Sequence, residues 1–476
     1  METGVLHKQV AERIAALVSG GTFRVGDRLP SIREMSRQAQ VSINTVKAAY
    51  AHLEDRCLIE ARPQSGYYVC PPPMEPPREP KIVGRDIAPR GISSSKLVER
   101  LMRATLDGDK VQFGAAIPDP ALVPAGKLGR IMAAACRNHP GESTAYATGY
   151  GYGRLRSQIG RWMLKAGCTL SADDIIITGG ASEAVFLALQ AVTKPGDTVA
   201  MGSPMYFNFV QMLQLLDLRV VEIPTSPSEG LHLPTLRSAL AANDIACCLV
   251  IGNYDNPLGS CLSDQRKREL TELLAAAGVP LVEDDINGDL CHGEERPSVC
   301  KAWDRDGNVL LCSSFSKTLA PGYRVGWIAP GRHLEEVLHR KLVSNIASAS
   351  PGQLAVAEFL ADGGYSRHLR AIRRAYAAKL GRMAEDIARS FPAGTRVTRP
   401  AGGFTLWLEL PAEVDTVDLY ASAEREKISF APGRIFSTRG EYCNCLRLNG
   451  ACWSEKTSWA VHALGRMAGE LCRRRD

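Results

Sequence analysis

The sequence has no apolar run of 18 residues, and its mean hydropathy is −0.11. A helix that crosses a bilayer needs about 20 predominantly apolar residues, so we expect no membrane span. The first 17 residues are charged and amphipathic without a central apolar stretch, so we also expect no secretory signal peptide. Apolar residues make up 45% of the chain and charged residues 23%, which excludes a wholly disordered protein.

Metal-binding cysteine patterns are missing as well. The 14 cysteines are scattered, none forms a CxxC pair, and none of the nine histidines has a ligand spacing to a cysteine. Zinc sites are identified by such spacings, so we expect no bound metal. Reduced, mostly buried thiols in a cytoplasmic protein are the ordinary interpretation.

Charge of one sign is only in modest excess. The chain has 57 Lys and Arg against 51 Asp and Glu, a net charge of +6. A nucleic-acid-binding protein and an enzyme for acidic substrates can both have this balance, so the charge alone does not decide between them.

Proline is dense in one segment, residues 70–80, which read CPPPMEPPREP. Such a segment forms neither a helix nor a central strand and predicts a semi-rigid spacer. At ~3.1 Å per residue, residues 71–90 could span on the order of 60 Å. We therefore predict an N-terminal domain over residues 1–70, a linker over 71–92 and a large domain over 93–476.

The pattern before the linker predicts three helices and a hairpin. Ser31 begins the second helix with a capping box, and Ser42 caps a third helix over residues 44–55. Residues 58–61 and 67–69 are strand-like and are separated by a turn. This is the order of a winged helix-turn-helix domain, although a small dimerisation or peptide-docking module would share it.

The third helix begins with small polar side chains that can approach a phosphate or a base edge. Arg33 is the candidate for reading a guanine, because its forked guanidinium matches O6 and N7. Arg62 and Gly66 would place the wing on the backbone or the minor groove. The predicted DNA-contacting residues are Arg33, Ser42, Asn44, Thr45, Lys47, Arg62 and Gly66.

The motif Gly26-Asp27-Arg28-Leu29-Pro30-Ser31-Ile32-Arg33, the segment 41–46 and the turn 62–67 closely resemble the GntR family of bacterial regulators. The resemblance covers residues 5–69 and implies double-stranded operator DNA as a partner. Cys57 stands where the family usually has a glycine in the left-handed conformation. If that conformation is kept, the cysteine would destabilise the turn by roughly 1 kcal/mol.

Beyond residue 173, short apolar runs alternate with helical segments. The runs are residues 175–177, 198–200, 220–221, 248–251, 281–283 and 309–311. This alternation predicts an α/β fold with a mostly parallel sheet, in which ligands bind at the carboxyl ends of the strands.

Two groups at such strand ends could hold a phosphate. Gly180, Ala181 and Ser182 open a helix, where free amides and a hydroxyl form an anion cradle. Ser314 and Arg324 flank a later motif and could reach the same anion. Glycine-rich turns are often only turns, so this signal is weak alone.

Two further residues extend the pattern. Asp284 follows a strand and could hold a protonated ring nitrogen, although a solvated loop or a metal site would read the same way. Lys317, among small hydroxyl residues, could form an imine with an aldehyde, although a lone lysine is ordinarily a surface residue. Phosphate cradle, carboxylate and lysine together are what pyridoxal 5'-phosphate requires.

The order and spacing resemble the fold-type I aminotransferases across residues 110–470. The resemblance implies that Lys317 is the catalytic lysine, that Tyr206 stacks on the pyridine and that Asn256 contacts the ring's 3-oxygen. It also implies that Arg447 binds a substrate or effector carboxylate. Asn287 stands where the family has a tyrosine; because asparagine is shorter and neutral, we expect a raised imine pKa and slower proton transfers.

A GntR-like domain joined by a linker to an aminotransferase-like domain is the layout of the MocR family of regulators. This resemblance implies a cytoplasmic, DNA-binding transcription factor. It implies pyridoxal 5'-phosphate held as an imine on Lys317, a small amino compound as effector, and a head-to-tail homodimer.

Three functions remain open. A regulator would couple ligand binding at Lys317 to operator binding. An aminotransferase with an accessory N-terminal domain would turn over, and the residues present would permit half-transamination. A sensor or reservoir of the cofactor would need no amine chemistry. The helix-turn-helix with Arg33, Ser42 and Asn44 favours the regulator, because an enzyme does not need it.

Overall fold

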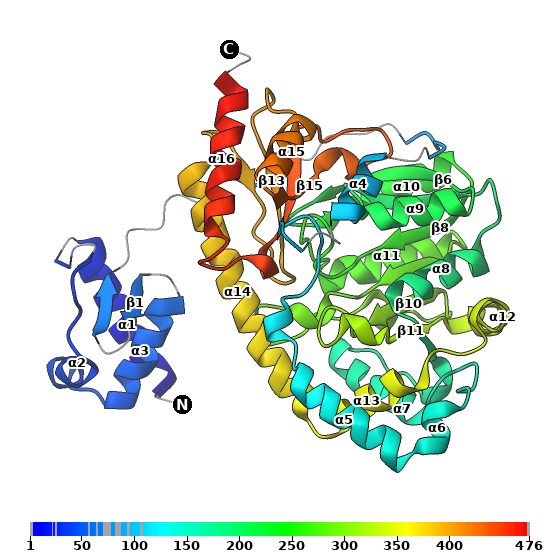
Figure 1. The fold of residues 1–476 in the computed structure, drawn as a ribbon, viewed down its shortest axis with the longest axis horizontal. Helices are drawn as coiled ribbons and strands as arrows, with labels where there is room; N and C mark the ends of the chain where they lie inside the picture. Colours follow the sequence, from blue (N-terminus) through cyan, green and yellow to red (C-terminus); the bar gives the residue numbers. More distant parts are fainter. Residues whose placement is uncertain are drawn as a thin grey trace. The chain divides into compact units, whose positions relative to one another are not determined.

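The computed structural model describes residues 3–20, 22–23, 26–55, 58–62, 65–69, 78–80, 87–92, 96–104 and 108–473. Cys57, Cys70 and residues 71–77 and 81–86 of the predicted linker lie outside these ranges, as does the side chain of Arg62. The chain divides into two compact units, Met1–Pro76 and Pro77–Asp476 (Figure 1).

The first unit is a winged helix-turn-helix. Its elements are α1 (Thr3–Ser19), α2 (Ile32–Ala39), α3 (Ile43–Asp55) and an antiparallel hairpin of β1 (Ile59–Arg62) and β2 (Gly66–Val69). The predicted capping box of Ser31 and Glu34 is present, and Ser42 Oγ accepts the amide of Thr45 at 3.1 Å. Val46, Tyr50 and other apolar residues of the three helices form one buried core with the hairpin. The predicted domain type is confirmed.

The second unit is built on an eight-stranded sheet of order β4-β11-β10-β9-β8-β5-β6-β7. Its strands are β4 (Ile176–Thr178), β5 (Thr198–Ser203), β6 (Arg219–Ser226), β7 (Gly230–Leu231), β8 (Ile245–Val250), β9 (Leu281–Asp284), β10 (Val309–Ser314) and β11 (Gly326–Ala329). Neighbours from β10 to β6 run parallel, whereas β11 and β7 pair antiparallel with their neighbours. The prediction of a mostly parallel sheet is confirmed, and its two antiparallel strands were not predicted.

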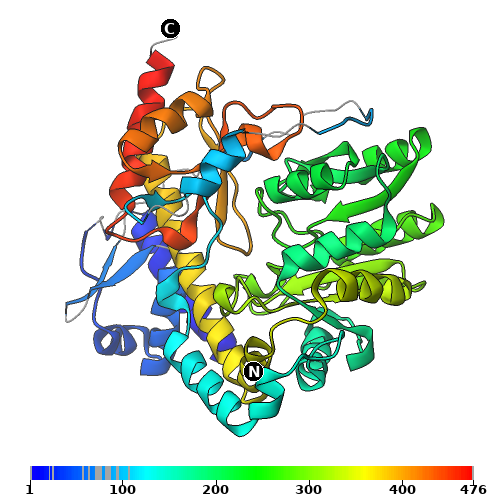
Figure 2. The same cartoon turned by 45° about the vertical axis from the view of Figure 1, so that its right-hand side comes forward.

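Both faces of the sheet are covered, as Figure 2 shows for the helices that pack on it. Val199 of β5 is buried with residues of α8 (Ala181–Val192) and α9 (Phe207–Leu215). Its neighbour Ala200 is buried with residues of α10 (Leu233–Ala242) and α11 (Asp264–Ala276). Successive strand residues point to opposite faces, so a strand buried on both faces is apolar throughout.

A smaller sheet completes the unit, with order β12-β13-β16-β15. Its strands are β12 (Arg396–Val397), β13 (Thr405–Glu409), β15 (Ala431–Pro432) and β16 (Cys445–Asn449), and β3 (Val111–Gln112) pairs separately with β14 (Ile428–Ser429). The remaining helices are α4 (Lys96–Ala104), α5 (Ala125–Asn138), α6 (Pro140–Thr144), α7 (Gly153–Met163), α12 (Leu334–Asn345), α13 (Ser350–Ala361), α14 (Gly364–Ser390), α15 (Thr416–Arg425) and α16 (Ser458–Arg473). In the part of the chain just described, no helix is both long and apolar enough to cross a membrane.

The described part of the predicted linker is bonded to the second unit. Arg90 and Val220 of β6 exchange backbone hydrogen bonds of 3.0 and 2.9 Å. The carbonyl of Ile87 accepts from Asn243 Nδ2 at 3.1 Å, and the side chains of Ile87 and Ile92 pack on the buried clusters. Residues 87–92 therefore lie against the sheet, because Ile87 and Ile92 gain burial there, while the spacer expected over residues 71–90 stays a prediction.

Candidate cofactor site and DNA-contacting surface

Lys317 lies just beyond β10, and its side chain is half-buried. Its Nζ donates a hydrogen bond to the carbonyl of Ala116 at 2.5 Å. Burial lowers the pKa of the Lys317 amine to about 8, with Arg447 and Arg324 acting in the same direction and Asp284 opposing them. With a pKa in this range about a tenth of the lysine is neutral at pH 7, far more than for an ordinary lysine, and the neutral amine is the form that attacks a carbonyl.

The carboxylates of Asp284 and Asp285 have separate roles. Burial raises the pKa of Asp284 to about 7, and the charge of Lys317 acts against this rise. Its Oδ1 accepts the amide of Ile286 at 3.1 Å. Asp285 instead forms an ion pair with Arg296 and accepts from Asn253 Nδ2 at 2.8 Å. Asp284 is therefore the carboxylate in electrostatic contact with Lys317.

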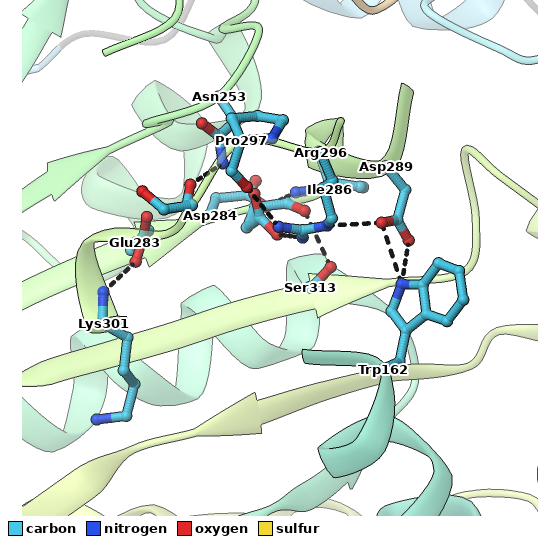
Figure 3. A network of polar contacts seen from close by, with 12 residues as sticks. Trp162, Asn253, Glu283, Asp284, Ile286, Asp289, Arg296, Pro297, Lys301 and Ser313 are labelled. Atoms are coloured by element: carbon cyan, nitrogen blue, oxygen red, sulfur yellow. Dashed lines mark hydrogen bonds and ion pairs between the residues drawn. The ribbon is translucent and has the colours of Figure 1, made fainter. Parts of the chain in front are cut away.

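A polar network lies behind this carboxylate pair (Figure 3). Arg296 Nε and Trp162 Nε1 both donate to Asp289, at 2.6 and 2.9 Å. The hydroxyl of Tyr365 is 2.9 Å from both Asp289 Oδ2 and Thr318 Oγ1, and Thr318 directly follows Lys317. The network therefore joins the end of β9 to the lysine loop and limits the movement of both.

Arg324 and Gly180, two of the residues predicted to hold a phosphate, lie together at the start of α8. Gly180 has φ +110°, and a Cβ placed on it would overlap the guanidinium of Arg324. Arg324 donates to the carbonyl of Gly179 at 2.7 Å and to Ser316 Oγ at 3.4 Å. Ser314 Oγ accepts the amide of Ser316 at 3.2 Å. A guanidinium, hydroxyls and a helix N-terminus in one place form a suitable site for a dianion.

Arg447, on β16, is fully buried. Its Nη1 donates to Asn256 Oδ1 at 2.9 Å, its Nη2 donates to the carbonyl of Gly114, and its Nε has no hydrogen-bond partner among the described residues. Burial lowers the pKa of Arg447 to about 10. The one charged or ionisable neighbour that affects the pKa of Arg447 among the described residues is Tyr206, not a carboxylate, so an anionic ligand would complete its environment.

Tyr206 and Asn256 line a cavity at the carboxyl ends of β5 and β8. Burial raises the pKa of the Tyr206 phenol, and Arg447 and Asp284 influence it in opposite directions, so its ring lies within reach of both charges. Asn287 Nδ2 donates to the carbonyl of Tyr254 at 2.8 Å. In this structure the residue at the expected tyrosine position thus holds a neighbouring loop.

These observations fit pyridoxal 5'-phosphate. The buried Arg447 has an unused donor, Lys317 has a lowered pKa, and the Gly180 turn has no room for a side chain beside Arg324. Lys317, Asp284 and the cradle residues Gly180, Ala181, Ser182, Ser314 and Arg324 would hold the group.

Most of the residues predicted to contact DNA from the helix-turn-helix are exposed. Arg33 in α2 and Ser42, Asn44 and Lys47 at the start of α3 are exposed, and Thr45 is half-buried. The hydroxyl of Tyr50 donates to the carbonyl of Pro30 at 2.7 Å and fixes the start of α2 against α3. Side chains on rigid helix ends can be presented to a groove with defined spacing.

Sequence reasoning missed two features of this surface. The guanidinium of Arg28 lies over Gly66, with its Nε 3.1 Å from where a Cβ on that glycine would be. Ile43, at the start of α3, is 50% exposed although apolar. An exposed apolar side chain there could contact a thymine methyl group. Ser316 was missed in the second unit, although it lies inside the motif that identified Lys317.

An aminotransferase fold of type I and a winged helix-turn-helix thus occur on one chain. The model for class I and II aminotransferases matches residues 118–463, and the model for bacterial regulatory proteins of the gntR family matches residues 6–69. The chain is 38% identical to the HTH-type transcriptional regulator YdcR of Escherichia coli K12, covering 98% of this chain and 99% of the relative. It is 39% identical to YjiR of the same organism, over 94% of each chain.

The chain belongs to the GntR-type transcriptional regulators of the MocR layout, in which a DNA-binding domain is fused to an aminotransferase-like domain. Among solved structures, it is similar to LysN, the α-aminoadipate aminotransferase of Thermus thermophilus. The TM-score is 0.73 at 27% identity, covering 80% of this chain and 96% of that one. LysN was solved with a phosphopyridoxyl-leucine, and aminotransferases of this family depend on pyridoxal 5'-phosphate.

Proposed function

We propose that this regulator senses pyridoxal 5'-phosphate, or an amino compound that reacts with it, at Lys317 and transmits the binding event to operator DNA. The observation that carries the proposal is the partly buried Lys317, whose pKa is lowered to about 8 between Arg447, Arg324 and Asp284. When bound, the cofactor supplies an aldehyde that amines can attack and a ring that accepts electrons.

The chain's own residues would bind and orient this ligand. Arg324 and the amides at the start of α8 would hold the phosphate, while buried Asp284 would hold a proton at the ring nitrogen. The side chain of Tyr206 would cover the ring. Arg447, held by Asn256, would bind the carboxylate of an amino-acid effector in two-point contact.

We further propose that the protein acts in the cytoplasm as a homodimer, with the head-to-tail arrangement implied by the MocR layout. Two winged units would then read two half-sites of a duplex, as paired helix-turn-helix units do. Arg33 would read a guanine, and Arg62 and Gly66 would place the wing. Under this proposal, residues 71–92 connect the two domains.

The experiment for DNA recognition uses the gene's own upstream region in an anisotropy titration. Arg33→Ala should weaken specific binding by roughly 1–3 kcal/mol and relax the preference at one base position. Lys47→Ala serves as the comparison, because a phosphate contact should weaken binding to all sequences alike. Equal losses for Arg33→Ala on operator and random duplex would contradict base readout.

The experiment for cofactor binding is borohydride reduction followed by peptide mass spectrometry. We expect a phosphopyridoxyl group on Lys317 in the parent protein and none in Lys317→Ala. The same two proteins are then titrated with operator in the presence and absence of cofactor. A variant that responds to cofactor as the parent does would indicate a sensor that needs no amine chemistry.

An aminotransferase is the second candidate. Lys317, Asp284, Asn256 and Arg447 supply the groups that amine transfer needs, and the 2-aminoadipate transaminase of Thermus thermophilus is 28% identical over 79% of this chain. Sustained conversion of an amino acid and a keto acid over many turnovers, with no effect of either compound on operator binding, would favour the enzyme.

A further inference from the structure

One helix of the second unit, α14, has a net positive charge nearly as large as that of the whole chain. α14 has 27 residues and contains seven Lys and Arg against two acids, a surplus of five, whereas the whole chain has a surplus of six. Residues 1–69, which include the winged helix-turn-helix, contain nine Lys and Arg against seven acids. The DNA-reading unit is therefore nearly neutral, and most of the chain's excess charge lies elsewhere.

Five of the seven basic residues of α14 lie on one exposed face. Arg367, Arg370, Arg374 and Arg382 are exposed and follow the spacing that places residues on the same side of a helix. Arg389 is exposed on the same side. We call these five residues the α14 basic face. The exposed residues between them, Ala371, Ala378 and Gly381, are small, and half-buried Glu385 lies on the same side.

The length of this face suits a duplex. From Arg367 to Arg389 it extends about 33 Å at the rise of an α-helix, close to one turn of B-DNA at about 34 Å. Figure 1 shows α14 along the outer edge of the second unit, from α5 and α13 at one end to α16 at the other. The small residues between the arginines would let a phosphate backbone approach the helix closely.

Few of these charges are neutralised within the described residues. Arg389 pairs with Glu385 at 3.6 Å, and Arg374 Nε donates to a backbone carbonyl, that of Arg370, at 3.3 Å. Asp362, near Arg367, already pairs with Lys127 at 2.7 Å. Lys165 adds a further cation, since its Nζ donates to Ser366 Oγ at 3.3 Å.

We propose that the α14 basic face binds the phosphate backbone of DNA that flanks the operator. A row of exposed guanidiniums without an apolar anchor is typical of backbone contacts rather than of a protein interface, which needs a buried apolar centre. The inference rests on the proposed function, because it requires that the winged unit first bind an operator.

The test compares two duplexes with the full-length protein. One is the shortest piece of the gene's upstream region that still binds specifically, and the other extends it by 20 base pairs at each end. The logarithm of the affinity falls linearly with the logarithm of the salt concentration, and each phosphate contact makes this slope steeper by about 0.9. If three arginines contact the extension, raising salt from 50 to 200 mM should weaken long-duplex binding roughly 40-fold more than short-duplex binding.

Arg367→Gln/Arg370→Gln/Arg374→Gln should abolish this difference and leave short-duplex binding unchanged. The matched control is Arg237→Gln/Arg268→Gln/Arg305→Gln, three exposed arginines on other parts of the second unit, which should retain the difference. The single change Arg374→Gln, which should lower the slope by about 0.9, replaces the triple variant if that variant unfolds at a lower temperature.

Equal slopes for the two duplexes in the parent, or equal losses in the triple variant and the control, would overturn the inference. Stronger face-dependent binding to duplex RNA or to anionic vesicles than to DNA would also overturn it. Failure of the parent to bind the short duplex specifically would instead count against the proposed function, so the two failures are distinguishable.

Discussion

At the residue scale, Gly180 decides whether the phosphate cradle can form. Its φ of +110° disfavours any side chain, and a Cβ would also overlap the guanidinium of Arg324. Gly196 has a φ of +89° but no atom within 4 Å of a Cβ. Substituting alanine at Gly196 therefore introduces backbone strain alone, whereas at Gly180 it introduces both strain and a clash with Arg324.

Gly180→Ala should destabilise the second unit by about 1–3 kcal/mol and weaken cofactor binding, because both strain and displacement of Arg324 contribute. Gly196→Ala should show only the strain, with cofactor affinity unchanged. Thermal unfolding and a cofactor titration by absorbance measure both effects. Unchanged cofactor affinity in Gly180→Ala would show that Arg324 does not hold the phosphate.

Asp284 gives a second prediction, on the pH dependence of stability in the cofactor-free protein. Burial raises the pKa of Asp284 to about 7, above the ordinary value of an aspartate near 4. The folded state keeps a proton that the unfolded chain has released, so the free energy of unfolding falls as pH rises from about 4 to 7. Asp284→Asn should remove this part of the fall.

Denaturant unfolding of the parent, Asp284→Asn and the exposed Asp173→Asn at several pH values would measure this. The parent and the Asp173 variant should lose stability more steeply with pH than the Asp284 variant. Parallel curves for all three proteins would mean that Asp284 is ionised throughout.

At the scale of elements, local sequence signals were sufficient to predict the helices and the hairpin of the winged unit. The capping box of α2 and the cap of α3 depend on residues three apart, so they can be read directly from the chain. The antiparallel strands β7 and β11 depend on pairing with distant segments and carry no local signal of direction.

The same distinction applies to the cofactor site. The motif around Lys317 identified the lysine, and strand alternation predicts that Glu283 and Asp284 lie on opposite faces of β9. The partners that define the roles come from far along the chain. Arg296 pairs with Asp285, and the carbonyl of Gly114 accepts from Arg447, neither of which spacing can predict.

The capping box gives a prediction for the element that carries Arg33. Ser31 Oγ accepts the amide of Glu34 at 3.3 Å, and Glu34 Oε2 accepts the amide of Ser31 at 2.8 Å. Ser31→Ala should destabilise α2 by about 1 kcal/mol and weaken operator binding with it. Amide hydrogen exchange in α2 measures the change, with exposed Gln38→Ala as the control. Equal exchange rates in both variants would contradict a stabilising cap.

At the scale of the whole molecule, the connection between the units is partly fixed. Arg90 pairs with Val220 of β6, a strand of the central sheet, so the described end of the connecting segment belongs to the ligand-binding unit. Earlier in the chain, the carbonyl of Arg78 accepts the amide of Val397 at 3.0 Å, so this described residue is also bonded to the second unit.

Any coupling between cofactor binding and operator binding must be reciprocal. If cofactor at Lys317 changes operator affinity by some factor, the operator must change cofactor affinity by the same factor, because both describe one free-energy cycle. We expect a factor of roughly 5 to 150, the range of a 1–3 kcal/mol coupling. Operator titrations with and without cofactor, and cofactor titrations with and without operator, measure the two factors independently. Lys317→Ala should bring both factors closer to one by the same amount. If both factors equal one, cofactor binding and operator binding are independent of each other in this protein.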